Sequence, residues 1–91
     1  MAHSSSAKKR VRQNLKQRAR NRWRKSRVKD DVKQFLRAVR EGDATKAEDA
    51  YRTASRTLDQ VAAKGAIHKN AAARRKSRLA KRLKRLTQPA A

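Results

Sequence analysis

One stretch decides the fold of this chain, and from Ala7 to Glu41 it reads AKKRVRQNLKQRARNRWRKSRVKDDVKQFLRAVRE. The stretch contains neither Gly nor Pro, which predicts one uninterrupted helix. Its first part, from Lys8 to Lys29, holds twelve Lys or Arg and no Asp or Glu. A surface with so dense a charge of one sign attracts a partner of the opposite sign. The stretch therefore predicts a long basic helix that binds a polyanion.

The apolar residues divide this helix into two halves. At about 100° per residue, those of the second half fall within an arc of about 100°, as in a helix that packs on neighbours; they are Val28, Val32, Phe35, Leu36 and Val39. Those of the first half drift to nearly the opposite side; they are Val11, Leu15, Ala19 and Trp23. Cations surround the first half, so no apolar face holds it in water. We expect the second half to belong to a core. We expect the arm, residues 8–27, to be frayed alone and ordered by its partner.

Composition limits the class of protein. With 91 residues, 36% hydrophobic content and three aromatic residues, the chain has enough apolar surface for one domain with a thin core. A net charge of +21 favours nucleic acid as the partner. The absence of Cys excludes disulfides and thiolate metal sites. We find no signal-like apolar region at the start and no stretch long enough to span a membrane, so we expect a cytoplasmic protein with no membrane partner.

Two glycines predict where helices end. Gly42 can close the first helix in the left-handed conformation, and Asp43 follows as a capping residue for the second. Gly65 is the second stop, and Pro89 ends a third helix. The prediction is one all-α domain over 1–91, an antiparallel three-helix bundle with a long, projecting basic N-terminal helix. Its parts are a flexible tail at 1–6, with a candidate cap among Ser4, Ser5 and Ser6, and helices at about 7–41, 44–64 and 68–87.

The second and third helices also carry apolar sides. That of the second comprises Ala47, Ala50, Tyr51, Ala54, Leu58, Val61 and Ala62, and that of the third comprises Ala72, Leu79, Leu83 and Leu86, with Ile67 at its entry. Residues 30–63 hold six Lys or Arg and seven acids, net −1, between segments of +12 and +10. We therefore expect the second helix to face solvent and the third to carry a row of cations on its outer side. These cations are Arg74, Arg78, Lys81 and Arg85.

Catalytic patterns are missing from the sequence. The two histidines, His3 and His68, lie 65 positions apart, and there is neither a Gly-rich phosphate loop nor a zinc-like spacing. We therefore predict that the chain is not an enzyme and has no cofactor, no metal and no small-molecule substrate. The acids Asp30 and Asp31 are interpreted as moderating the charge of Arg27 and Lys33.

Two side chains in the basic segments have more than one interpretation. Trp23 lies off the apolar stripe, and it could stack on an unpaired base or ribose, or be an exposed residue that packs on the arm. His68 precedes the third helix, where it is either a cap or a nucleic-acid contact beside Lys69 and Asn70. Arg outnumbers Lys at positions 18–27, and its forked guanidinium suits phosphates and bases.

Residues 62–79, AAKGAIHKNAAARRKSRL, resemble the signature of the S-twenty family of bacterial small-subunit ribosomal proteins. Further matches are Ser6-Ala7-Lys8-Lys9-Arg10, Arg20-Asn21 with Lys25-Ser26, and Gly42-Asp43 with Ala47. The resemblance covers almost the entire chain. It implies a helical bundle that binds 16S ribosomal RNA directly, early in assembly, near the bottom of the subunit body. Trp23 and the pair Asp30-Asp31 depart from the family's pattern.

The resulting hypothesis is a ribosome-bound structural constituent of the small (30S) subunit whose partner is 16S ribosomal RNA, with few protein contacts and no homo-oligomer. The expected RNA-binding residues are Lys8, Lys9, Arg10, Arg12, Lys16, Arg18, Arg20, Arg22, Trp23, Arg24, Lys25, Ser26, Arg27, Lys64, His68, Lys69, Asn70, Arg74, Arg75, Arg78, Lys81 and Arg85. The alternative is a nucleoid-type protein that binds and compacts DNA. A membrane-surface helix would need a continuous apolar face, which the arm lacks.

Overall fold

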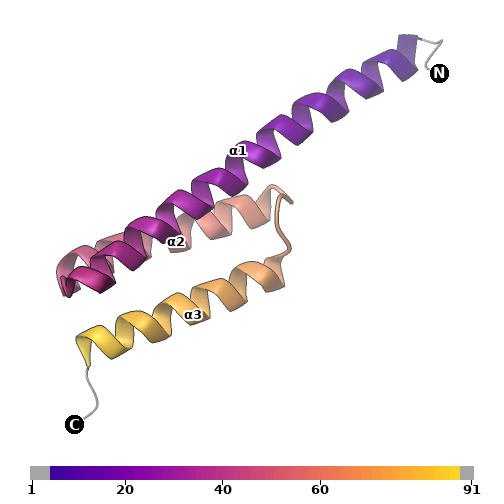
Figure 1. Ribbon diagram of the computed structural model, residues 1–91. Coiled ribbons are helices and arrows are strands. Elements are labelled where there is room, and N and C mark those ends of the chain that lie inside the picture. The colour runs from indigo at the N-terminus through magenta and orange to yellow at the C-terminus, as the bar shows by residue number, and fades with distance from the viewer. Residues whose placement is uncertain (1–4, 89–91) are drawn as a thin grey trace.

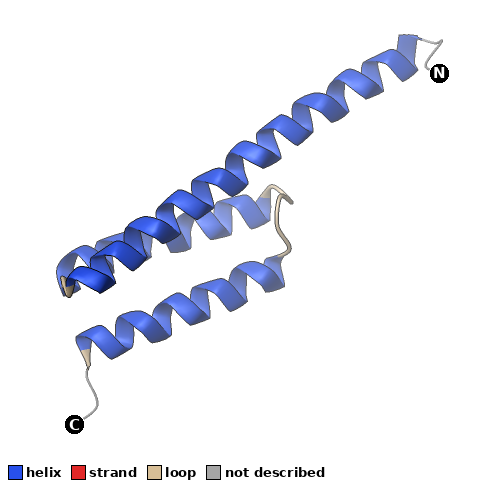
Figure 2. Ribbon diagram, viewed as in Figure 1, coloured by secondary structure: helices blue, strands red, loops and turns tan. Residues whose placement is uncertain are grey.

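The computed structural model describes residues 5–88 and contains three helices, α1 (Ser5–Glu41), α2 (Ala44–Ala63) and α3 (Lys69–Thr87). Successive helices run antiparallel (Figure 1), and the described residues contain no strand (Figure 2). The predicted all-α fold with three antiparallel helices is confirmed. Four predicted features lie outside the described residues: the first four residues of the tail, His3, Ser4 as a cap, and Pro89 as the stop of the third helix.

The molecule is elongated because α1 is much longer than its neighbours. At about 1.5 Å per residue, its 37 residues extend for about 55 Å, whereas the 20 and 19 residues of α2 and α3 extend for about 30 Å. The principal extents are 68 × 22 × 16 Å, and the radius of gyration is 17.9 Å, against about 12 Å for a compact chain of this length. The N-terminal half of α1 therefore projects beyond the other two helices (Figure 1).

Both turns use glycine for the same physical reason. Gly42 and Gly65 have φ of 74° and 78°, a region that side chains with a Cβ rarely adopt. After α1, Gly42 N donates to Val39 O (3.0 Å) and Asp43 N to Ala38 O (3.1 Å), which is the Schellman pattern. Gly65 and the residue after it repeat this pattern at the end of α2.

Side-chain caps begin the two following helices. Asp43 Oδ1 accepts a hydrogen bond from Lys46 N at 3.0 Å, and His68 Nδ1 accepts one from Asn70 N at 3.1 Å. Each bond satisfies a backbone donor that has no partner within its own helix. Of the two roles considered for His68, the structure shows the cap. At the start of α1, Ser5 and Ser6 are helical, so the helix begins two residues before Ala7.

The core lies along α2, which contacts both other helices. Its buried apolar residues are Val28, Phe35, Ala38, Ala47, Ala54, Leu58, Val61, Ala72 and Leu79. The alanines of α2 let α1 approach closely, and the Phe35 and Tyr51 ring centroids lie 6.1 Å apart. The core-facing stripe of α1 is confirmed in position, but the sequence interpretation missed Ala38 and Thr57, both of which are buried.

Thr57 explains the position of one acidic residue. Only 2% of Thr57 is exposed, and its hydroxyl donates to Asp31 Oδ2 at 2.5 Å. A buried hydroxyl without a partner would be costly, so Asp31 supplies an acceptor across the α1–α2 contact. Asp31 makes no ion pair within residues 5–88, and its hydrogen bond to Thr57 is a role that the sequence interpretation missed.

Candidate nucleic-acid interface

The arm presents its charge without internal compensation. Every side chain from residue 8 to residue 20 is exposed. The ion pairs within residues 5–88 are Arg37–Glu41 at 3.8 Å and Lys76–Asp59 at 3.0 Å, and neither involves the arm. The arm cations are therefore available to an external anion.

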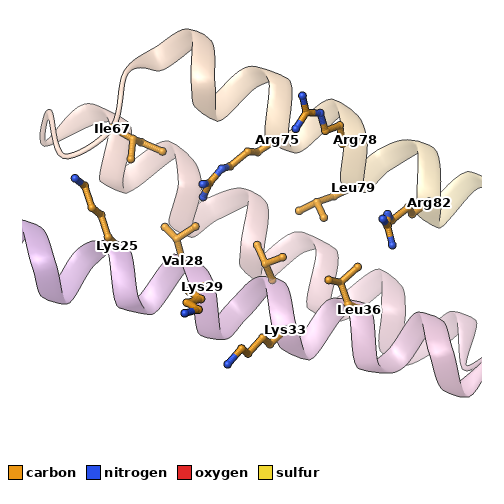
Figure 3. Close-up of a pocket in the computed structure, with 11 residues that line it drawn as sticks. Lys25, Val28, Lys29, Lys33, Leu36, Ile67, Arg75, Arg78, Leu79 and Arg82 are labelled. Carbon is orange, nitrogen blue, oxygen red and sulfur yellow. The ribbon is translucent and has the colours of Figure 1, made fainter.

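A second cationic surface lies between α1 and α3, which make few contacts with each other. A groove of about 810 Å³ separates them, and Figure 3 shows its lining. From α1 it is lined by Lys25, Val28, Lys29, Val32, Lys33 and Leu36; from the α2–α3 turn by Ile67; and from α3 by Arg75, Arg78, Leu79 and Arg82. The groove thus has an apolar floor between a row of lysines and a row of arginines.

Helical spacing produces both rows. Lys25, Lys29 and Lys33 follow one another at intervals of four residues, so they lie along one side of α1. On α3, the arginines at 75, 78 and 82 are separated by three and four residues and lie beside the buried Leu79. In Figure 3, Arg75 and Leu79 extend from α3 towards α1.

The groove concentrates positive potential. The residues of the described chain that line it include six cations and no Asp or Glu. A cleft lined by one sign of charge, with apolar walls, strengthens the field at its centre. Lys supplies a compact charge to a phosphate, and Arg supplies a fork that can bind two phosphate oxygens. This arrangement suits a phosphate-bearing strand.

The groove includes some of the predicted site residues and excludes others. Lys25, Arg75 and Arg78 line it. The predicted outer row on α3 is therefore divided, since Arg78 lines the groove while Lys81 and Arg85 line a shallow hollow near the end of the helix. Arg74 is exposed and lines neither of them.

Three groove cations were missed by the sequence interpretation, namely Lys29, Lys33 and Arg82. The spacing that links Lys25 to the next two lysines was a usable signal. The position of Arg82, seven residues after Arg75, was another.

The α2–α3 turn adds polar groups at one end of the groove. Because Nδ1 of His68 accepts the capping bond, the neutral ring carries its proton on Nε2, which is a donor. Three exposed side chains are close to His68 in the sequence, namely Lys64, Lys69 and Asn70. The predicted contact Ser26, on α1, is exposed as well. The remaining predicted contacts near the end of the arm, Trp23, Arg24 and Arg27, lie together where α1 meets α2.

Two other kinds of site, a metal centre and a membrane span, are absent from the described residues. Within residues 5–88, no group of three or more His, Cys, Asp or Glu could hold a metal ion. None of the helices in this part of the chain is long and apolar enough to cross a membrane.

Comparison with known proteins decides the family. Residues 2–84 match the family model described as Ribosomal protein S20. The chain belongs to this family. Members of the S20 family that resemble it include the small ribosomal subunit protein bS20 of Shouchella clausii, 51% identical over 87 residues that cover 96% of this chain and 99% of the relative. That of Nitrosomonas eutropha is 48% identical over 79 residues, covering 87% and 91%. The resemblance stated from the signature at residues 62–79 is confirmed, and membership of a ribosomal protein family means that the chain is not an enzyme.

Proposed function

We propose that this chain is a structural constituent of the small ribosomal subunit that binds 16S ribosomal RNA directly. The observation that carries the proposal is the pair of cationic surfaces, the arm and the α1–α3 groove, that have no acidic ion-pair partner among the described residues. Its relatives are named as small ribosomal subunit proteins, which supports the choice of RNA. The protein would be bound to ribosomes in the cytoplasm, as a single copy with few protein contacts.

The proposed mechanism is the placement of RNA segments that otherwise repel. The arm projects away from the packed helices and neutralises one segment, while the groove and the α2–α3 turn neutralise another. Contacts with phosphates fix position and orientation but carry little sequence information. Specificity would come from RNA shape, such as A-form grooves and junctions. Binding early in assembly, near the bottom of the subunit body, is part of the proposal.

A competition experiment tests the proposal. The protein is bound to a labelled 16S transcript in moderate salt and challenged with unlabelled 16S transcript or with duplex DNA. We expect the RNA to compete at lower concentration. A preference for duplex DNA would instead support a nucleoid-type protein, and failure to bind 16S transcripts in dilute buffer would refute the proposal outright.

Single substitutions locate the binding surface in the same assay. Arg20→Ala removes an exposed arm cation and should weaken RNA binding while leaving the fold intact. Arg52→Ala removes an exposed cation from α2 and serves as the matched control. Circular dichroism of both variants checks the fold. Equal loss of affinity in the two variants would contradict the assignment of binding to the arm.

A further inference from the structure

A small hollow lies where α1 and α2 meet. It is on a different side of α1 from the groove. Around the axis of α1, the hollow residue Trp23 lies about 140° from the buried Val28 in one direction, and the groove residue Lys29 lies about 100° from it in the other. The hollow has a volume of about 270 Å³. Its lining, called the Trp23 hollow below, includes Trp23, Arg24 and Arg27 from α1, with Thr57, Gln60 and Lys64 from or next to α2.

In the helical conformation of α1, the indole of Trp23 is oriented by its neighbours but is largely uncovered. The guanidinium carbon of Arg27 lies over the ring, 5.8 Å from the ring centroid, in a cation–π arrangement. Nevertheless, 63% of Trp23 is exposed. Arg24, which is half-buried, is oriented by a hydrogen bond from its Nη1 to Asn21 Oδ1 at 3.2 Å. The ring therefore offers an oriented, flat and apolar surface that no other described residue covers completely.

The groups around the ring define what could cover it. Arg24, Arg27 and Lys64 supply positive charge, and the side-chain amide of Gln60 makes no hydrogen bond within residues 5–88. The nearby carboxylate of Asp31 already accepts a hydrogen bond from the Thr57 hydroxyl. A ligand that suits this environment is flat, carries a polar edge and is attached to phosphate.

We infer that the Trp23 hollow binds one unpaired nucleobase of RNA. This inference rests on the proposed function and adds a base contact to what are otherwise phosphate contacts. The base stacks on Trp23, the amide of Gln60 can pair with its polar edge, and the flanking cations contact the phosphates on either side. Unpaired bases are commonly bound on aromatic side chains in this way. The volume is below the range of about 300–1,000 Å³ that is usual for drug-sized ligands, which fits one base rather than a longer segment.

Trp23 is the chain's single tryptophan, so its fluorescence reports on the hollow directly. The full chain is titrated in low salt with three probes: single-stranded oligoadenylate of about 12 nucleotides, within the site sizes of single-strand-binding proteins, an abasic strand of equal length, and oligoadenylate paired with oligouridylate. We expect all three to bind, and only the single strand with bases to quench Trp23 at saturation. Equal quenching by the abasic strand, or unchanged emission with bound oligoadenylate, would overturn the inference.

Affinities of variants provide a second readout. Trp23→Leu should lower the affinity for oligoadenylate by about 5- to 150-fold, the range expected for loss of one stacked base, and leave the affinity for the abasic strand unchanged. Leu15→Ala, at an arm residue of similar exposure, should change neither. An equal loss for both strands in Trp23→Leu would mean that Trp23 acts only on the arm's structure, against the inference.

The two proposals fail in different ways. Absence of binding to 16S transcript in dilute buffer would refute the proposed function and this inference together. Normal binding of the transcript by Trp23→Leu, with unchanged emission of the original chain in the complex, would refute the base contact alone.

Discussion

The clearest test of the groove removes its lysine row while leaving the helix intact. Replacing Lys25, Lys29 and Lys33 by Gln takes three charges from the α1 wall. All three are exposed and have no acidic partner within residues 5–88, so no carboxylate is left unpaired. Gln has nearly the helix propensity of Lys, and the neighbouring core residue Val28 is untouched. The variant should therefore fold like the original chain.

The expected effect follows from counterion release. Each phosphate that a cation neutralises contributes about −0.7 to −0.9 to the slope of log K against log[salt], depending on the strandedness of the nucleic acid. Loss of three contacts should reduce the magnitude of the slope by about 2 to 3. Between 50 and 200 mM salt, the original chain should then lose about 20- to 40-fold more affinity than the variant.

Fluorescence anisotropy of a labelled 16S fragment over a salt series provides the measurement. The control replaces Lys46, Arg52 and Arg56, all exposed on α2, by Gln. Both triple variants lower the net charge equally, so a general effect of charge is the same in each. We expect the control to keep the original slope. An equal reduction of the slope in both variants, or an unchanged slope in the groove variant, would refute the assignment of phosphate contacts to the lysine row.

Four further predictions concern stability and order. Leu58→Ala empties a fully buried position and should lower the free energy of unfolding by about 2–5 kcal/mol in urea; a loss below about 1 kcal/mol would argue against the packing described. Thr57→Val leaves the Asp31 carboxylate without its donor and should cost about 1–3 kcal/mol, whereas a neutral result would show the bond to be dispensable. His68→Ala removes a cap and should lower the free energy of unfolding by about 0.5–2 kcal/mol, whereas His68→Asn should be nearly as stable as the original chain. Thermal melts of both variants measure this, and an equal loss of stability in the two would contradict capping. Backbone chemical shifts of the free protein should show residues 7–27 less helical than in the RNA complex, and a fully helical arm at low salt would be the adverse result.

Much of the fold is readable from local patterns. Gly42 and Gly65 mark the two turns because only a residue without a Cβ adopts positive φ at little cost. The periodic apolar residues around Phe35 identify the side of α1 that packs. These features depend on residues a few positions apart, so the sequence displays them directly.

The groove and the Asp31–Thr57 bond are harder to predict because they depend on how helices are placed. Periodicity gives the angle of each side chain around its own helix, but not the separation between two helices. Asp31 and Thr57 are 26 positions apart, and nothing in the local pattern links them. The apolar sides of the first and third helices suggested that they would meet, yet cations at Lys29 and Arg82 lie at the edges of these sides and keep the groove between them open.

The position of α2 explains how two such basic helices coexist in one domain. Apolar contacts supply most of the cohesion, and α2 adds a polar link to each partner: Thr57 to Asp31 on α1, and Asp59 to Lys76 on α3 at 3.0 Å. In the part of the chain that the structure describes, no Asp or Glu lines the groove between α1 and α3, and the like charges of its two sides oppose closer approach. A bound phosphate chain supplies the missing anions, and a ligand that binds only the folded state stabilises it by mass action. RNA binding should therefore raise the stability of the packed helices as well as order the arm, since the charge that forms the proposed binding surface also limits the stability of the fold.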